Sequence, residues 1–237
     1  MQRYLSFGAG VNSTALMLWL LDHGVQFEAV YADHGTDWPE TRDYVAMLQR
    51  AGYPVTVLQA RRGGLNLYDY YYKHAMVLMR WVRACTVEYK LVPLAAYMAT
   101  PCIVYLGISA EESHRIARII AGQRPGEENR FPLADEGITR ADCIEIIQSH
   151  GLPIPIKSGC YICPFQRKSQ WVQLRTKHPD LFCKAKALEA VTNRRVTALG
   201  RPPICLAHDK PLDLVAMAGQ MDLFGDRDFE CPCSCEF

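Results

Sequence analysis

The chain has 237 residues, of which 49% are hydrophobic, so it can bury the core of one large domain or of one domain with an appendage. Its formal net charge of +1 excludes a strong overall attraction to nucleic acid or to a membrane and leaves only local patches. Residues 1–4 do not resemble a signal peptide and no apolar run reaches about 18 residues, so we expect a soluble, cytoplasmic protein without a membrane contact.

The first fifteen residues or so predict a strand, a loop and a helix. Residues 3–7 form an apolar strand pattern, residues 8–13 are mostly small, and residues 14–21 form a mostly apolar helical run. Small residues let backbone N–H groups approach phosphate oxygens at a helix N-terminus, where Ser13 and Thr14 can cap the helix or donate hydroxyls. The loop is neither a Walker A motif nor Gly-x-Gly-x-x-Gly, and an ordinary strand-to-helix turn is the alternative.

The next segments predict repeated strand–helix–strand units. Residues 26–32 and 54–58 read as strands, and Pro39 opens a helix whose apolar stripe contains Tyr44, Val45 and Leu48. This order predicts an α/β fold with a parallel sheet, in which ligands bind beyond the carboxyl ends of the strands. Residues 8–13 and 33–36 should therefore share one edge of the sheet. For Asp33 alone, a solvated turn or a helix cap is the alternative.

The rest of the chain predicts one more strand and several helices. The aromatic run 68–73 either packs against a core or presents tyrosines that stack on bases. Residues 102–106 read as a strand, residues 122–130 as a polar surface loop, and residues 139–150 as a helix capped by Thr139. Residues 164–221 read as helices with a Pro-rich break at 201–203. Without a repeat or linker, we expect a single domain over residues 1–237 with a cysteine-rich tail at 226–237.

Ten cysteines are many for a protein of a reducing compartment, where clustered cysteines indicate metal or redox chemistry. Cys160 and Cys163 have the Cys-x-x-Cys spacing of zinc and iron–sulfur ligands, and Cys85 lies far upstream. Four isolated cysteines are expected to be small core residues. They are Cys102, Cys143, Cys183 and Cys205.

Four segments together resemble the phosphoadenosine phosphosulfate (PAPS) reductase family of the PP-loop ATP pyrophosphatases. Residues 6–15 resemble its opening loop, residues 31–41 its Asp-Thr-Gly…Pro-Glu-Thr segment, and residues 106–115 its later strand-end motif, with Glu112 and Arg115. An upstream set of Cys85, Lys90, Pro93 and Leu94, followed by residues 159–163, resembles the cluster pattern of adenylylsulfate reductases. The loop departs from Ser-Gly-Gly-x-Asp-Ser at Gly8, Ala9 and Asn12, and His34 replaces Thr.

The resemblance implies a fold and a set of site residues. The fold would be the parallel-sheet adenine nucleotide alpha hydrolase-like (HUP-type) fold with a helical C-terminal part. Catalytic roles would fall to Asn12, Ser13 and Asp33, and a metal would be held by Cys85, Cys160 and Cys163. The nucleotide-binding residues would be Ser6, Gly8, Ala9, Gly10, Ser13, Thr14, Asp33, Gly107 and Arg115.

The cofactors implied are ATP, Mg²⁺ and a 4Fe–4S cluster. One of the paired cysteines of the pattern is replaced by Thr86, or by Ala84 in a shifted register, so the cluster would have one open iron or a fourth ligand from elsewhere. The partners implied are ATP, a nucleic-acid substrate (DNA or tRNA), a sulfur-donor protein and a second copy of the chain.

The expected function is an ATP pyrophosphatase that adenylates a substrate for sulfur insertion, of the DNA phosphorothioation or tRNA thiolation type. A PAPS or adenylylsulfate reductase and a non-catalytic nucleotide-binding module are the alternatives. A reductase would need a nucleophilic cysteine in the tail, where Cys231, Cys233 and Cys235 lie. Glu230 and Glu236 disfavour a thiolate there, so deletion of residues 230–237 should spare ATP cleavage.

Overall fold

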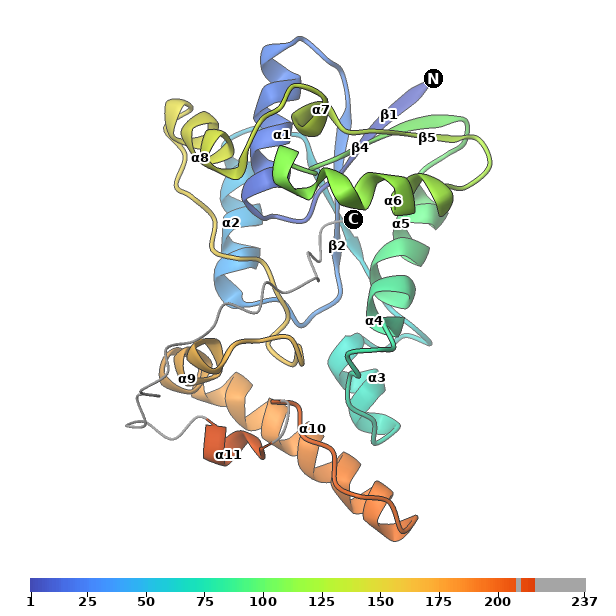
Figure 1. Cartoon of the computed structure of the whole chain (residues 1–237), viewed down its shortest axis with the longest axis vertical. Helices are drawn as coiled ribbons and strands as arrows, with labels where there is room; N and C mark the ends of the chain where they lie inside the picture. The colour runs from blue at the N-terminus through green and yellow to red at the C-terminus, as the bar shows by residue number, and fades with distance from the viewer. Residues whose placement is uncertain (208–209, 216–237) are drawn as a thin grey trace. The chain divides into compact units, whose positions relative to one another are not determined.

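The computed structural model describes residues 1–207 and 210–215, and contacts group them into two compact units (Figure 1). Unit 1 contains residues 1–60 and 88–159, and unit 2 contains residues 61–87, 160–207 and 210–215. The cysteine-rich tail at 226–237 lies outside the described residues, so its role stays a prediction. The single domain expected over the whole chain likewise stays a prediction.

Unit 1 contains a five-stranded parallel sheet, which confirms the expected α/β class. Its strands are β1 (Gln2–Ser6), β2 (Glu28–Asp33), β3 (Val55–Gln59), β4 (Cys102–Leu106) and β5 (Glu127–Arg130), in the order β3-β2-β1-β4-β5. In the central strand β1, Leu5 pairs with Ala29 of β2 and with Tyr105 of β4. These positions are buried because helices cover both faces of a parallel sheet.

The helices of unit 1 lie on both faces of this sheet (Figure 1). Helices α1 (Val11–Asp22), α2 (Pro39–Arg50) and α8 (Arg140–Ser149) lie on one side, and α5 (Val92–Tyr97) and α6 (Ile116–Ala121) on the other. This is the arrangement expected of right-handed crossovers, because the chain reverses its direction across the sheet between β3 and β4. The core on the first side contains Leu16 of α1, Leu48 of α2 and Ile147 of α8. Shorter elements complete the unit: a π-helix, η1 (Val87–Leu91), a 3₁₀-helix, η2 (Ala110–Arg115), and α7 (Pro132–Asp135).

Helix α1 begins three residues earlier than the sequence predicts. Gly10 is extended, with φ −100° and ψ 179°, and Val11 is the first helical residue. The hydroxyl of Ser13 accepts a hydrogen bond from the N–H of Gly10 at 3.1 Å, which stabilises the start of the helix. The loop after β1 is therefore only residues 7–10, and Asn12 and Ser13 belong to the first helical turn.

The prediction of a polar loop over residues 122–130 is wrong for its second half, because residues 127–130 form β5. The strand lies at the edge of the sheet and alternates half-buried with exposed residues, so it shows no apolar pattern. Backbone pairing with β4 holds it, with Cys102 opposite Glu127. Such long-range pairing leaves no local signal in the sequence.

Unit 2 is helical, as expected for the C-terminal part of the chain. Its helices are α3 (Leu67–Lys73), α4 (Ala84–Thr86), α9 (Lys168–Lys177), α10 (Pro179–Ala198) and α11 (Leu212–Val215). The unit joins its two chain segments through Arg80, which donates to the carbonyl of Pro164 at 2.7 Å and 3.0 Å. Ring contact between Tyr68 and Tyr161 joins the same segments.

The isolated cysteines do not all behave as expected. Cys102 and Cys143 are fully buried, which confirms their assignment to the core. Cys205 is half-buried, and Cys183 is exposed, so the assignment of Cys183 to the core is wrong. Cys183 follows the buried Phe182 on α10 and lies on the solvent side of that amphipathic helix.

In the described part of the chain, no helix combines the length and the apolar character needed to cross a membrane.

Candidate nucleotide site

The topology of the sheet defines where a ligand should bind in unit 1. The chain runs outward from β1 to β2 and β3 and then returns to β4 on the other side of β1. This reversal is a topological switch point, where open α/β sheets bind ligands beyond the carboxyl ends of the strands. The segments that follow β1, β2 and β4 start at this edge. Ser6 and Asp33 are the last residues of β1 and β2. The segments that follow contain the other eight sequence-predicted residues outside the cysteine set: Gly8, Ala9, Gly10, Asn12, Ser13, Thr14, Gly107 and Arg115.

The N-terminus of α1 presents backbone donors at the switch point. No described residue accepts a hydrogen bond from the N–H groups of Val11, Asn12 or Ser13, although all three residues are buried. Such N–H groups carry the positive end of the helix dipole and need an acceptor. The hydroxyl of Ser6 is also buried without a hydrogen-bond partner among the described residues. An anion at this position would satisfy these donors.

Ala9 adopts a left-handed backbone conformation in the loop, with φ of +55°. This region favours glycine, because the Cβ of an L-residue crowds the backbone there. Ala9 stands where the resembled PP-loop pattern has glycine, so the backbone geometry explains that glycine physically. Alanine has the smallest side chain with a Cβ, so Ala9 keeps this strain at its smallest.

The strain at Ala9 predicts opposite behaviour for two substitutions. Ala9→Gly should change the free energy of unfolding by no more than about 1 kcal/mol, because relief of strain offsets added chain entropy and the loss of a buried methyl. Ala9→Val should destabilise the protein by more than about 2 kcal/mol, because a β-branched residue fits this backbone poorly at a buried position. Denaturant unfolding measures both, and equal stabilities for the two variants would refute the assignment.

Gly107 brings the end of β4 against the start of α1. A Cβ placed on Gly107 would lie 2.8 Å from the backbone N of Ser13 and 3.0 Å from its Cα. The backbone atoms it would meet cannot rotate away as a side chain can. Glycine at this position therefore sets the distance between the strand end and the helix N-terminus.

Asn12 links three elements of the site through its side chain. Its amide donates to Glu112 of η2 at 3.0 Å, and its amide oxygen accepts from Arg140 of α8 at 3.2 Å. Glu112 also accepts from Arg115 at 2.7 Å. An asparagine, with one donor group and one acceptor group, satisfies a carboxylate and a guanidinium together. Asn12 acts here as a positioning residue for the helix N-terminus.

The Asn12 network predicts a charge-dependent defect. Asn12→Asp removes the donor and places a second carboxylate beside Glu112, which should cost about 1–3 kcal/mol and weaken ATP binding. The double variant Asn12→Asp/Glu112→Gln restores a donor–acceptor pair and should recover most of both losses. A double-mutant cycle on stability and on ATP affinity measures the coupling. Additive effects of the two substitutions would show that the contact has no such role.

The end of β2 holds Asp33 by local hydrogen bonds. Its carboxylate accepts from the N–H of Gly35 at 2.7 Å and from the amide of Gln59 at 3.3 Å. Gly35 has φ of +78°, which this turn requires. The side chain of Asp33 is only partly buried, so its carboxylate remains at the sheet edge.

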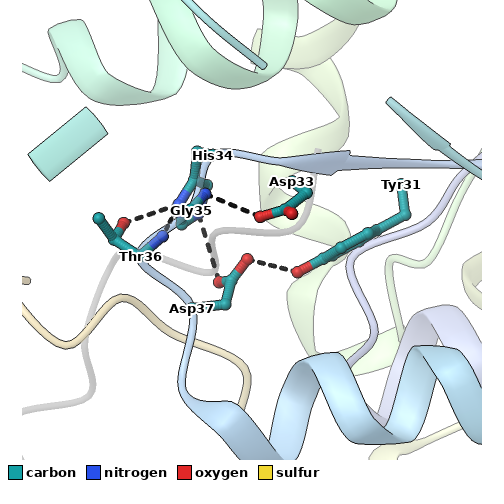
Figure 2. Close-up of polar contacts among 6 residues, drawn as sticks. All are labelled: Tyr31, Asp33, His34, Gly35, Thr36 and Asp37. Carbon is teal, nitrogen blue, oxygen red and sulfur yellow. Dashed lines mark hydrogen bonds and ion pairs between the residues drawn. The ribbon is translucent and has the colours of Figure 1, made fainter. Parts of the chain in front are cut away.

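Tyr31 of β2 and three side chains of the turn that follows this strand form a buried polar network, drawn in Figure 2. His34 contacts Asp37 through Nε2 at 3.3 Å and Thr36 through Nδ1 at 2.7 Å, and Tyr31 donates its hydroxyl to Asp37. All four residues are no more than 5% exposed. Both ring nitrogens of His34 are therefore engaged, which suits a structural role better than proton transfer.

Electrostatics in this network favour an ionised Asp37. Burial of its carboxyl opposes ionisation, but the positive charge and hydrogen bond of His34, with Lys90 and the hydroxyl of Tyr31, lower its pKa to about 2. Burial and the adjacent Asp37 raise the pKa of Tyr31, so its hydroxyl stays protonated and continues to donate. The network fixes the turn that carries Asp33.

The three predicted metal ligands all lie in unit 2. Cys85 is in α4, and Cys160 is buried in a turn in which the N–H of Cys163 donates to its carbonyl at 3.0 Å. Within residues 1–207 and 210–215, no group of three or more His, Cys, Asp or Glu side chains has an arrangement that could hold a metal ion. The cluster at Cys85, Cys160 and Cys163 therefore stays a prediction.

Sequence reasoning missed Arg140 and the pairing of Tyr31 with Asp37. Arg140 reaches Asn12 across 128 positions of the chain, and no periodicity or spacing reports such a contact. Tyr31 and Asp37 are close in sequence, and an acidic residue shortly after a strand tyrosine was the one available signal.

A scan against protein-family models and a search of curated proteins returned no match for this chain.

Proposed function

We propose that the chain is a PP-loop ATP pyrophosphatase with the adenine nucleotide alpha hydrolase-like fold. The observation that carries this proposal is the set of three buried N–H groups without described acceptors at the N-terminus of α1, located at the switch point of the sheet. The sheet order and the resemblance of residues 6–15 and 31–41 to the PP-loop family support the choice of ATP over other anionic ligands.

The proposed reaction adenylates an acceptor. An oxygen of the acceptor attacks the α-phosphorus of ATP, the bond to the bridging oxygen of the β-phosphate breaks, and pyrophosphate leaves. A sulfur nucleophile then displaces AMP, which completes the exchange of oxygen for sulfur. The N-terminus of α1 would bind the departing pyrophosphate and stabilise its growing charge. Ser6 and Thr14 would add hydroxyl donors, and Ala9 and Gly10 would allow close backbone approach.

Mg²⁺ fits the donor set at the sheet edge. This ion is typically held by one or two carboxylates together with phosphate oxygens, and Asp33 places one carboxylate there. It would neutralise charge on the phosphates when bound. Arg115, paired with Glu112 on η2, would lie at the same edge for electrostatic contact with the nucleotide.

Pyrophosphate release tests the proposal against its two alternatives. With ATP, Mg²⁺ and an acceptor, the proposed enzyme releases pyrophosphate, and addition of a sulfur donor then releases AMP; it makes no sulfite from PAPS. A reductase would make sulfite from PAPS with a thiol donor and would need no ATP. A binding module would bind ATP and produce neither product. The last two outcomes would each overturn the proposal.

The iron–sulfur cluster is a separate part of the proposal and rests on the resemblance at Cys85, Cys160 and Cys163. Purification without oxygen, followed by iron and sulfide analysis, tests it directly. We expect iron, sulfide and a brown protein, and loss of all three in Cys160→Ser. A colourless protein with zinc would overturn the cluster while leaving the nucleotide site intact.

A further inference from the structure

The net charge of +1 conceals a strong division of charge between the two units. The described residues of unit 2 contain fifteen Lys and Arg against four Asp and Glu. Those of unit 1 contain ten Lys and Arg against fifteen Asp and Glu. The positive field therefore belongs to unit 2, and it is strong for a group of this size. A balanced sequence total gave no indication of this division.

The acidic residues of unit 2 do little to offset this charge. Glu189 is buried and accepts hydrogen bonds from the N–H groups of Leu206 at 2.8 Å and Leu212 at 3.1 Å. Asp213 forms an ion pair with Lys186 at 2.6 Å. By contrast, several exposed cations have no acidic partner among the described residues. They are Lys73, Lys177, Lys184, Arg194, Arg201 and Lys210.

Unit 2 also exposes aromatic rings beside its cations. Trp81 is 79% exposed between Arg80 and Arg83, and Arg80 is held in place by the carbonyl of Pro164. Tyr72 on α3 is 41% exposed and stacks on Tyr68. Exposure of a tryptophan ring to water is unfavourable in free energy, so an exposed tryptophan commonly marks a binding surface.

We infer that unit 2 binds single-stranded nucleic acid, with its lysines and arginines on the phosphates and with Trp81 stacked on a base. Positive charge alone would fit any polyanion, but a nearly fully exposed indole needs a flat apolar partner, and unstacked bases supply one. Duplex bases are already stacked on each other, so a duplex would use only the cations. The phosphates of DNA and RNA share this chemistry, and the experiment separates them.

Only one part of this inference rests on the proposed function, namely that the bound strand is the acceptor for adenylation. Binding itself depends on residues of unit 2 and requires no nucleotide. Oligonucleotide binding without ATP therefore tests the surface, and pyrophosphate release tests the enzyme. Gly10→Val, which alters the nucleotide loop, should leave oligonucleotide affinity unchanged.

The experiment measures fluorescence anisotropy of labelled 20-nucleotide DNA and RNA strands, with the full chain and no ATP. We expect saturable binding of the single strands. The strand that is bound more tightly, DNA or RNA, identifies the class of the acceptor. Trp81→Ala should weaken this binding about five- to a hundredfold and leave duplex binding nearly unchanged. Lys184→Glu/Arg194→Glu should weaken binding about tenfold or more and reduce the slope of log K against log salt by about 1.4.

A matched variant separates a local surface from overall charge. Arg118→Glu/Lys157→Glu makes the same charge change on exposed residues of unit 1 and should alter affinity less than about twofold. Equal weakening by the two double variants would overturn the inference. So would tighter binding of the duplex than of the single strand, or binding to vesicles of anionic lipid without binding to either oligonucleotide.

Discussion

Gly107→Ala is expected to weaken ATP binding strongly, because the added methyl would overlap the start of α1. Its Cβ would lie 2.8 Å from the backbone N of Ser13, so the strand end or the helix N-terminus must move. Overpacking of this kind costs about 1–3 kcal/mol in stability. A shift of the N–H groups also spoils the geometry on which anion binding depends, so ATP affinity should fall at least about tenfold. Titration calorimetry with ATP and denaturant unfolding measure the two effects.

Gly159→Ala is the matched control for this substitution. Gly159 also belongs to unit 1, but a Cβ there would meet no atom within 4 Å. The control should keep wild-type ATP affinity and unfold within about 0.5 kcal/mol of the wild type. If Gly107→Ala bound ATP as the control does, the close approach of β4 to α1 would have no part in the site.

Asp37→Asn should be among the most destabilising single substitutions in unit 1. The ionised carboxylate is buried between His34 and Tyr31, and its amide replacement cannot satisfy both as well. Breaking a buried charged network by altering one partner typically costs about 3–5 kcal/mol. The substitution should also weaken ATP binding, because the network supports the turn that holds Asp33. Asp22→Asn is the matched control, since its ion pair with His150 is largely exposed and should cost less than about 1 kcal/mol.

The same network predicts a loss of stability in acid. The pKa of Asp37 is lowered from 3.8 to about 2 in the folded protein, so the ionised form contributes stability above pH 4. Linkage makes this contribution about 2 kcal/mol, and it is lost as the pH falls from about 4 to 2. The difference in stability between the wild type and Asp37→Asn should narrow by about 2 kcal/mol as the pH falls across this range. A difference between the two that stays constant down to pH 2 would contradict the lowered pKa.

The sequence predicts the sheet and its edge well, because these features depend on local patterns. Residues 102–106 are an uninterrupted apolar run followed by Gly107, and the structure forms β4 over the same residues. Thr139 predicted the start of α8, where its hydroxyl and the Asp142 carboxylate form a capping box. Parallel topology then places residues after β1, β2 and β4 at one edge without any knowledge of side-chain contacts.

Features that depend on long-range contacts could not be predicted in this way. The strand β5 carries no apolar alternation, and the contact of Arg140 with Asn12 joins residues far apart in the chain. The left-handed conformation of Ala9 could not be predicted either, because a positive φ is common for glycine and rare for alanine. The division of charge can be recognised only once the boundaries of the two units are known, and no shift in composition along the chain marks these boundaries.

The central claim is that the N-terminus of α1 binds the phosphates of ATP, and Gly10→Val tests it most directly. Gly10 has φ −100° and ψ 179°, a conformation that valine adopts freely, so the variant should fold while its side chain blocks backbone approach. Gly159→Val controls for the added bulk at an open position. Titration calorimetry should show ATP binding by the wild type and the control, and at least about a hundredfold weaker binding by Gly10→Val. Equal ATP affinity in Gly10→Val and the wild type, or no ATP binding by the wild type, would contradict the claim.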